Sequence, residues 1–155
     1  MKSEARLAAV VRILTGILFI ASGYGKLTGS FVRDGFVKSA WQMAREGWPF
    51  WGSFLRSVVL PHPSVFAWIV AIGEFTLGVF LLIGLLTRAA AVGGVLLLFS
   101  ILLGQSYVPG SRWPGWITAG LTTKFAMLLL LAIAAAGYGA WGLDGRRRKV
   151  RLGFR

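Results

Sequence analysis

Cysteine is absent from the 155-residue chain, and histidine occurs once, at His62. Without thiolates the chain cannot itself form a catalytic disulfide, a thiolate zinc site or a cysteine-ligated iron–sulfur cluster. A single histidine also leaves no pair of imidazoles to hold a haem or another metal group. We therefore predict no metal site in this chain, and we expect any electron transfer to depend on another molecule.

Charge is scarce as well, since only 14% of the residues are charged while 56% are hydrophobic. A soluble domain usually carries about 25% charged residues. The apolar residues gather into four runs, at about 7–27, 64–86, 88–108 and 117–141. Each run is close to the roughly 20 helical residues that cross a bilayer core, and helices satisfy their own backbone in lipid. The sequence predicts an all-α integral membrane four-helix bundle, with residues 1–155 as one domain.

Acidic residues number only five against 17 lysines and arginines, which gives a formal net charge of +12. Such an excess can indicate nucleic-acid binding, but six of the 17 lie in the last ten residues, RRRKVRLGFR, and others flank the first and second predicted spans on the same side. Cytoplasmic segments of membrane proteins are rich in lysine and arginine. We expect a multi-pass protein of the cell membrane with both termini cytoplasmic, a tail near anionic lipids and no nucleic-acid partner.

The first outer loop, residues 28–63, is the only long connection between the predicted spans. Apolar residues recur at helical spacing from Val37 to Trp48, Trp41 among them, and Pro49 then interrupts the pattern before a second stripe that begins at Trp51. An aromatic amphipathic segment beside membrane spans is typical of a helix in the interface plane. The segment either covers the outer mouth of the bundle or serves as a lid or a docking surface for a partner.

Three ionisable residues fall inside the outer half of the predicted bundle. At about 1.5 Å per helical residue, Glu74 lies on the order of 15 Å from the outer surface, with Lys26 and Lys124 above it. Opposite charges at such depths should pair, which predicts a Lys26–Glu74–Lys124 cluster. The cluster is either a structural ion network or a polar pocket for a small anion, a quinone head group or a proton path. Tyr24 and Gln105 lie at similar depths and could bind the same ligand.

A second ion pair is predicted at the cytoplasmic end. Arg12 lies near the start of the first span and Asp144 ends the fourth, so the two charges should meet and close the inner rim. His62 lies between two prolines in the outer loop. It is either a turn residue or a proton carrier.

Three segments resemble the signatures of DoxX-type membrane proteins: GILFIASGYGKL at 16–27, GEFTLGVFLLIGLLTRAAA at 73–91 and GYGAWGLD at 137–144. In that family the first span closes with Gly-x-x-Lys. The second carries Glu-x-x-x-Gly and then Gly-Leu-x-Thr-Arg, and the last ends with Gly-x-Gly and Leu-Asp. The matching positions here are Gly23 and Lys26; Glu74, Gly78, Gly84, Leu85, Thr87 and Arg88; and Gly137, Gly139, Leu143 and Asp144. Residues 48–74 further resemble the DoxD-like variant, the large subunit of thiosulfate:quinone oxidoreductase.

The resemblance implies a membrane subunit linked to oxidation of a small sulfur compound such as thiosulfate, with quinone as electron acceptor and a second oxidoreductase subunit as partner. Lys26 and Lys124 would then attract the anion, and Glu74 would orient a lysine or carry the quinol proton. Membership of a family predicts fold better than reaction. Two alternatives stay open: a non-catalytic membrane anchor or assembly subunit, and a small-molecule or ion carrier, which would need a homo-oligomer to build a path.

Overall fold

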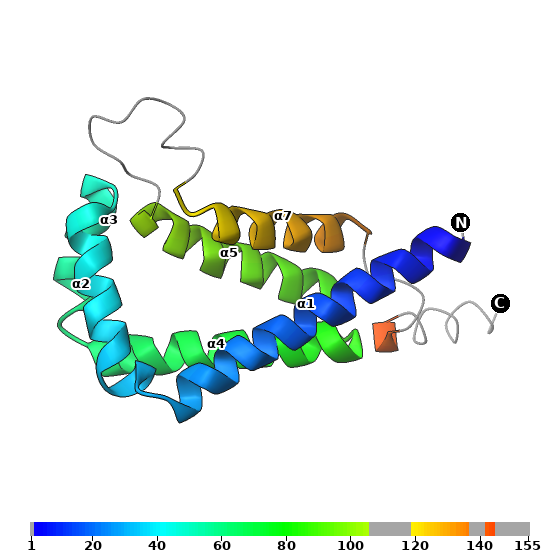
Figure 1. The fold of residues 1–155 in the computed structure, drawn as a ribbon, viewed down its shortest axis with the longest axis horizontal. Helices are drawn as coiled ribbons and strands as arrows, with labels where there is room; N and C mark the ends of the chain where they lie inside the picture. The colour runs from blue at the N-terminus through cyan, green and yellow to red at the C-terminus, as the bar shows by residue number, and fades with distance from the viewer. Residues whose placement is uncertain (1, 106–118, 137–141, 145–155) are drawn as a thin grey trace.

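The computed structural model describes residues 2–105, 119–136 and 142–144, and it contains helices but no strand within those ranges. The helices follow one another along the chain as α1 (Lys2–Thr28), η1 (Phe31–Gly35), α2 (Phe36–Glu46), α3 (Pro49–Phe54), η2 (Leu55–Val59), α4 (Pro63–Ile83), α5 (Thr87–Gln105) and α7 (Leu121–Ala136) (Figure 1). Two of them, η1 and η2, are π-helical turns. The predicted all-α membrane bundle is confirmed.

The long helices correspond to the predicted spans. Within the described ranges, three helices are long and apolar enough to cross a membrane: residues Ala5–Thr28 of α1, and the whole of α4 and of α5. Helix α7 is a shorter apolar helix. The fourth predicted span, 117–141, extends beyond it into residues that lie outside the described part.

Helices α1 and α4 form the most extensive helix pair of the bundle. Their backbones touch at glycines: a Cβ on Gly23 would lie 2.5 Å from the backbone nitrogen of Phe75, and one on Gly78 would lie 2.6 Å from that of Ile20. Small residues allow such close approach of helices in membranes. The pair therefore forms a fixed frame for the side chains along its seam.

The bundle is apolar outside and partly polar inside. Leu18 of α1 and Leu96 of α5 are each 65% exposed, whereas Arg12 and Glu74 are buried. An apolar core that includes Leu81 and the residues packed around it joins α1, α4, α5 and α7. Apolar side chains on the outside and ionisable groups on the inside are what lipid surroundings require.

Residues 31–59, which we name the cap segment, lie across one end of the long helices (Figure 1). The amphipathic pattern predicted for this loop is present in α2, because Ala40 and Ala44 are buried while Lys38 is exposed. Trp41 departs from the predicted stripe, since it is 45% exposed. Pro49 separates the two helices as expected and opens α3.

Backbone contacts hold the cap segment against the bundle. The backbone N–H of Trp48 donates to the carbonyl of Leu103 in α5 at 3.1 Å. Gly47 permits this approach, because a Cβ there would lie 3.0 Å from the same carbonyl oxygen. Within the cap segment, Nη1 of Arg56 donates to the carbonyl of Ala44 at 2.6 Å and ties η2 to α2. The cap segment is thus anchored at its centre as well as at its two ends.

Candidate functional site

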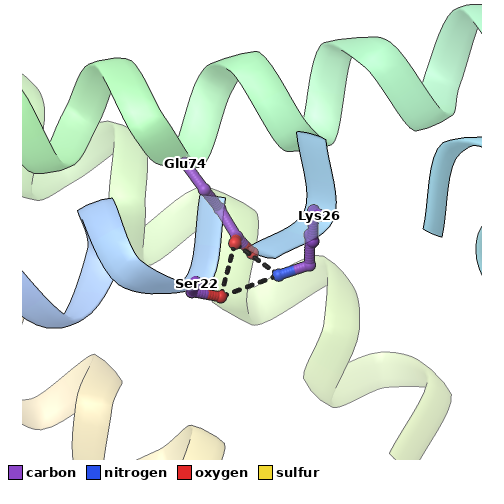
Figure 2. Close-up of polar contacts among 3 residues, drawn as sticks. All are labelled: Ser22, Lys26 and Glu74. Carbon is purple, nitrogen blue, oxygen red and sulfur yellow. Dashed lines mark hydrogen bonds and ion pairs between the residues drawn. The ribbon is translucent and has the colours of Figure 1, made fainter. Parts of the chain in front are cut away.

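An ion pair joins α1 and α4 below the cap segment. Lys26, in the last turn of α1, places Nζ against Oε2 of Glu74, near the middle of α4 (Figure 2). Ser22 lies one turn before Lys26 and completes the group: its Oγ donates to Oε2 of Glu74 at 2.8 Å and accepts from Nζ of Lys26 at 2.9 Å. The structure therefore brings together two of the three charges that the sequence placed in one cluster.

The two partners of this ion pair differ in burial. The Glu74 side chain is 5% exposed, whereas that of Lys26 is 23% exposed. The Lys26 ammonium also lies 5.4 Å from the ring centroid of Phe31 in η1, within the range of a cation–π interaction. Lys26 thus links the buried carboxylate to the underside of the cap segment.

A cavity of about 400 Å³ lies between the cap segment, α4 and α5, with Lys26 in its wall. Its lining is otherwise almost wholly apolar and aromatic. The lining residues are Lys26, Phe31, Phe36, Ser39, Ala40, Met43, Trp51, Phe54, Leu55, Val59, Phe66, Val70, Leu97, Ser100 and Ile101. A concave apolar site with a few polar groups is the usual form of a small-molecule site.

Trp51 is also part of this wall. Its indole stacks on Phe54, with ring centroids 5.0 Å apart and planes at 24°. Nε1 of Trp51 is buried and has no hydrogen-bond partner within the part of the chain that the structure describes. Leaving a buried donor unpaired costs about 1–3 kcal/mol, so an acceptor oxygen that reached Nε1 would relieve this cost. The sequence pattern marked Trp51 as the start of an apolar stripe but missed this donor.

The remaining predicted site residues lie away from the cavity. The polar contacts of Glu74 are those drawn in Figure 2, and Lys124 is not among them. Lys124 is on α7, which packs chiefly against α5. Gln105, at the end of α5, accepts a hydrogen bond from Oγ1 of Thr123 at 2.9 Å, and Tyr24 is 60% exposed on α1. None of these three predicted ligand-binding residues lines the cavity.

A second polar centre lies at the opposite end of the bundle, where α4 turns into α5. The Asp144 carboxylate accepts hydrogen bonds from the backbone N–H groups of Leu86, at 3.1 Å, and Thr87, at 2.9 Å. Thr87 is the first residue of α5, so Asp144 caps that helix in the manner of an N-cap carboxylate. The backbone N–H of Asp144 donates in turn to the carbonyl of Gly84 at 3.0 Å.

Arg12 fills the interior of this centre. It is fully buried, and its guanidinium lies against Gly84 and Gly142, where a side chain of any size would overlap it. Asp144 is close enough to interact electrostatically with Arg12, as the sequence led us to expect. The contacts of Asp144 and Arg12 thus join α1 to the turn between α4 and α5.

No group of three or more metal-ligating side chains occurs among residues 2–105, 119–136 and 142–144. His62 is exposed and immediately precedes α4, where its side chain makes no capping hydrogen bond. It lies outside the cavity lining. The chemistry of the site therefore depends on Lys26, Glu74 and Trp51.

Comparison with protein-family models gives a match to DoxX over residues 7–104. Comparison with curated proteins and with solved structures gives no match. The DoxX match covers well over half of the chain and contains most of α1, the cap segment, α4 and almost all of α5, and with them the ion pair and the cavity. On this match the protein belongs to the DoxX family of membrane proteins.

Proposed function

We propose that the protein is the quinone-binding membrane subunit of an oxidoreductase that acts on a small sulfur compound such as thiosulfate. The observation that carries the proposal is the cavity of about 400 Å³ beneath the cap segment, with Lys26 and Trp51 in a largely aromatic and apolar wall. Ligand sites for cofactor-sized molecules are commonly about 300–1,000 Å³ and mostly apolar.

The chemistry of the wall favours a quinone over a free anion. The Lys26 charge is already balanced by Glu74, and apolar walls offer little to replace the hydration of a small anion. A quinone ring has two apolar faces for the aromatic walls and carbonyl oxygens that accept hydrogen bonds. We assign those acceptors to Nζ of Lys26 and Nε1 of Trp51.

The ion pair suits the proton chemistry of quinone reduction, which takes up two electrons and two protons. Lys26 Nζ would donate to a carbonyl oxygen and stabilise the negative charge that develops there. Ser22 and Glu74 both contact Nζ and would hold it in place while it donates to that oxygen. The electrons would come from a second subunit, because the sequence has no cysteine and only one histidine.

The orientation in the cell membrane is part of the same proposal. We place the cap segment on the outer side and both termini in the cytoplasm, in line with the positive charge at residues 1–12, 88 and 146–155. Phe50 of α3 is 61% exposed on the cap segment and offers a contact for the partner subunit or for lipid headgroups. That exposure also supports the alternative of an anchor or assembly subunit. The carrier alternative gains no support, because α1, α4 and α5 are unbroken helices.

Quinone binding is tested with the full-length protein in lipid nanodiscs. Titration with ubiquinone-1 should quench tryptophan fluorescence along a saturable curve with one site per protein, because Trp51 lies in the cavity wall. The curve gives the dissociation constant directly. Quenching that rises linearly with quinone in the membrane, without saturation, would contradict the proposal, because partitioning into lipid alone gives that result.

Replacing Trp51 by phenylalanine should weaken the binding of ubiquinone-1 about 3- to 10-fold, because one hydrogen bond of roughly 1 kcal/mol is lost while the ring remains. The dissociation constant from the same titration measures the change. Trp41→Phe is the matched control: Trp41 is half-exposed on α2 and does not line the cavity, so its dissociation constant should stay unchanged. Equal weakening in both variants would show that Trp51 makes no specific bond to the ligand.

A further inference from the structure

A second hollow opens on the outer face of the bundle along the seam between α4 and α5. It is a groove of about 780 Å³ whose lining includes Trp68, Ile69 and Ile72 of α4 and Gly93 of α5. The first three side chains are 47%, 60% and 50% exposed, so the groove opens where lipid surrounds the protein. The only lining residues with a polar side-chain atom are Trp68, through its indole nitrogen, and Thr76, through its hydroxyl.

The groove and the cavity are neighbours along this seam. Leu97 of α5 lines both of them. Gly93, in the groove, and Ile101, in the cavity, lie four residues before and after Leu97, so all three share one face of the helix. The rise of a helix separates Gly93 from Ile101 by about 12 Å. On α4, Ile69 lines the groove and its neighbour Val70 lines the cavity.

Glycines keep the groove open. A Cβ on Gly73 of α4 would meet no atom within 4 Å, and one on Gly93 would meet only Cδ2 of Leu77, at 3.2 Å. Helix α4 also packs much less against α5 than against α1. The hollow is therefore a feature of the backbone and of missing side chains, and a Cβ added at position 73 would displace no other atom.

We infer that this groove holds the isoprenoid tail of the quinone whose ring lies under the cap segment. The inference rests on the proposed function and specifies its ligand as a long-tailed lipid quinone that reaches the site from within the bilayer. A polyprenyl chain is linear and wholly apolar, and the groove is lined mostly by apolar side chains. Because Leu97 lines both hollows, a chain that joined the ring site to the lipid would pass along its side chain.

The test compares quinones with and without a tail on a groove-filling variant. In nanodiscs, Gly73→Leu should weaken binding of ubiquinone-10 by about tenfold, because roughly two methylene groups' worth of burial is lost, and should change binding of the tail-free ubiquinone-0 by less than about twofold. Ala132→Leu is the control, since Ala132 is exposed on α7 and outside the groove. Quinone partitions into the lipid to the same extent with both variants. The ratio of their dissociation constants therefore measures the contribution of the groove alone.

Each outcome has a distinct meaning. Selective loss for ubiquinone-10 supports the inference. Unchanged binding of ubiquinone-10 overturns it and would leave the groove to a lipid acyl chain, and equal weakening of both quinones overturns it as well, because the substitution then acts on the ring site. Failure of the unaltered protein to bind either quinone would instead refute the proposed function.

Discussion

Replacement of Lys26 by methionine is expected to destabilise the protein by about 3–5 kcal/mol and to remove saturable quinone binding. Glu74 is 5% exposed and would keep its charge inside the bundle with only Ser22 as a partner. Glu74→Gln should cost less, because Lys26 is 23% exposed, keeps its bond to Ser22 and can extend toward the headgroups. Thermal unfolding in detergent, followed by tryptophan fluorescence, measures this asymmetry.

The double variant Lys26→Met/Glu74→Gln separates pairing from ligand binding. It should recover much of the stability lost in Lys26→Met, because no unbalanced charge remains inside the bundle, yet it should still fail to bind ubiquinone-1. The cycle then gives a coupling energy for the pair. Strictly additive effects on stability would show that the ion pair contributes nothing, and normal quinone affinity in the double variant would remove Lys26 from the binding site.

Replacement of Gly84 by alanine is expected to destabilise the fold by about 2–5 kcal/mol. Gly84 ends α4 in the left-handed region, at φ 68°, which disfavours any residue with a Cβ. The added Cβ would overlap Nη1 of the buried Arg12 and would lie 2.6 Å from Cα of Gly142. Reduced yield of folded protein and a lower unfolding temperature in detergent would register the loss.

Two further variants identify the cause. Gly25→Ala is the matched control, since a Cβ at Gly25 meets nothing within 4 Å, and it should leave stability unchanged or slightly raised. Gly84→Asn tests the backbone alone, because asparagine tolerates the left-handed region. It should remain nearly as damaging as alanine. Recovery with asparagine would show that backbone strain, and not the contact with Arg12, accounts for the loss.

The apolar runs of the sequence were sufficient to predict the long helices. The span expected at 64–86 appears as α4, Pro63–Ile83. The difference lies at its end, where Gly84 stops the helix and three residues of the predicted span form the turn to α5. The membrane depths estimated from the sequence also identified Lys26 and Glu74 as neighbours. The packing of α1 against α4 brings these two side chains into contact.

Depth fixes the height of a residue in the membrane but not the direction in which its helix faces. The sequence places Lys124 in the outer half of the bundle, as it does Lys26, yet α7 packs chiefly on α5, and the ion pair of Glu74 is with Lys26. The cavity could not be predicted from the sequence either, because its shape depends on how the cap segment folds back over α4 and α5. Its π-helical turns at 31–35 and 55–59 have no pattern in the apolar spacing that predicts them.

The centre around Arg12 bears on how this protein is made. Synthesis releases Arg12 in the first span well before Gly84 emerges, and Asp144 follows later still. Before those residues are made, the Arg12 guanidinium lies in the bilayer without the groups that surround it in the folded protein. Insertion measurements put the free-energy cost of an arginine at the centre of a helix at about 2.5–3.5 kcal/mol. We therefore expect the first helix to reach its final stability in the membrane only after Gly84 and residues 142–144 have been translated and packed against Arg12.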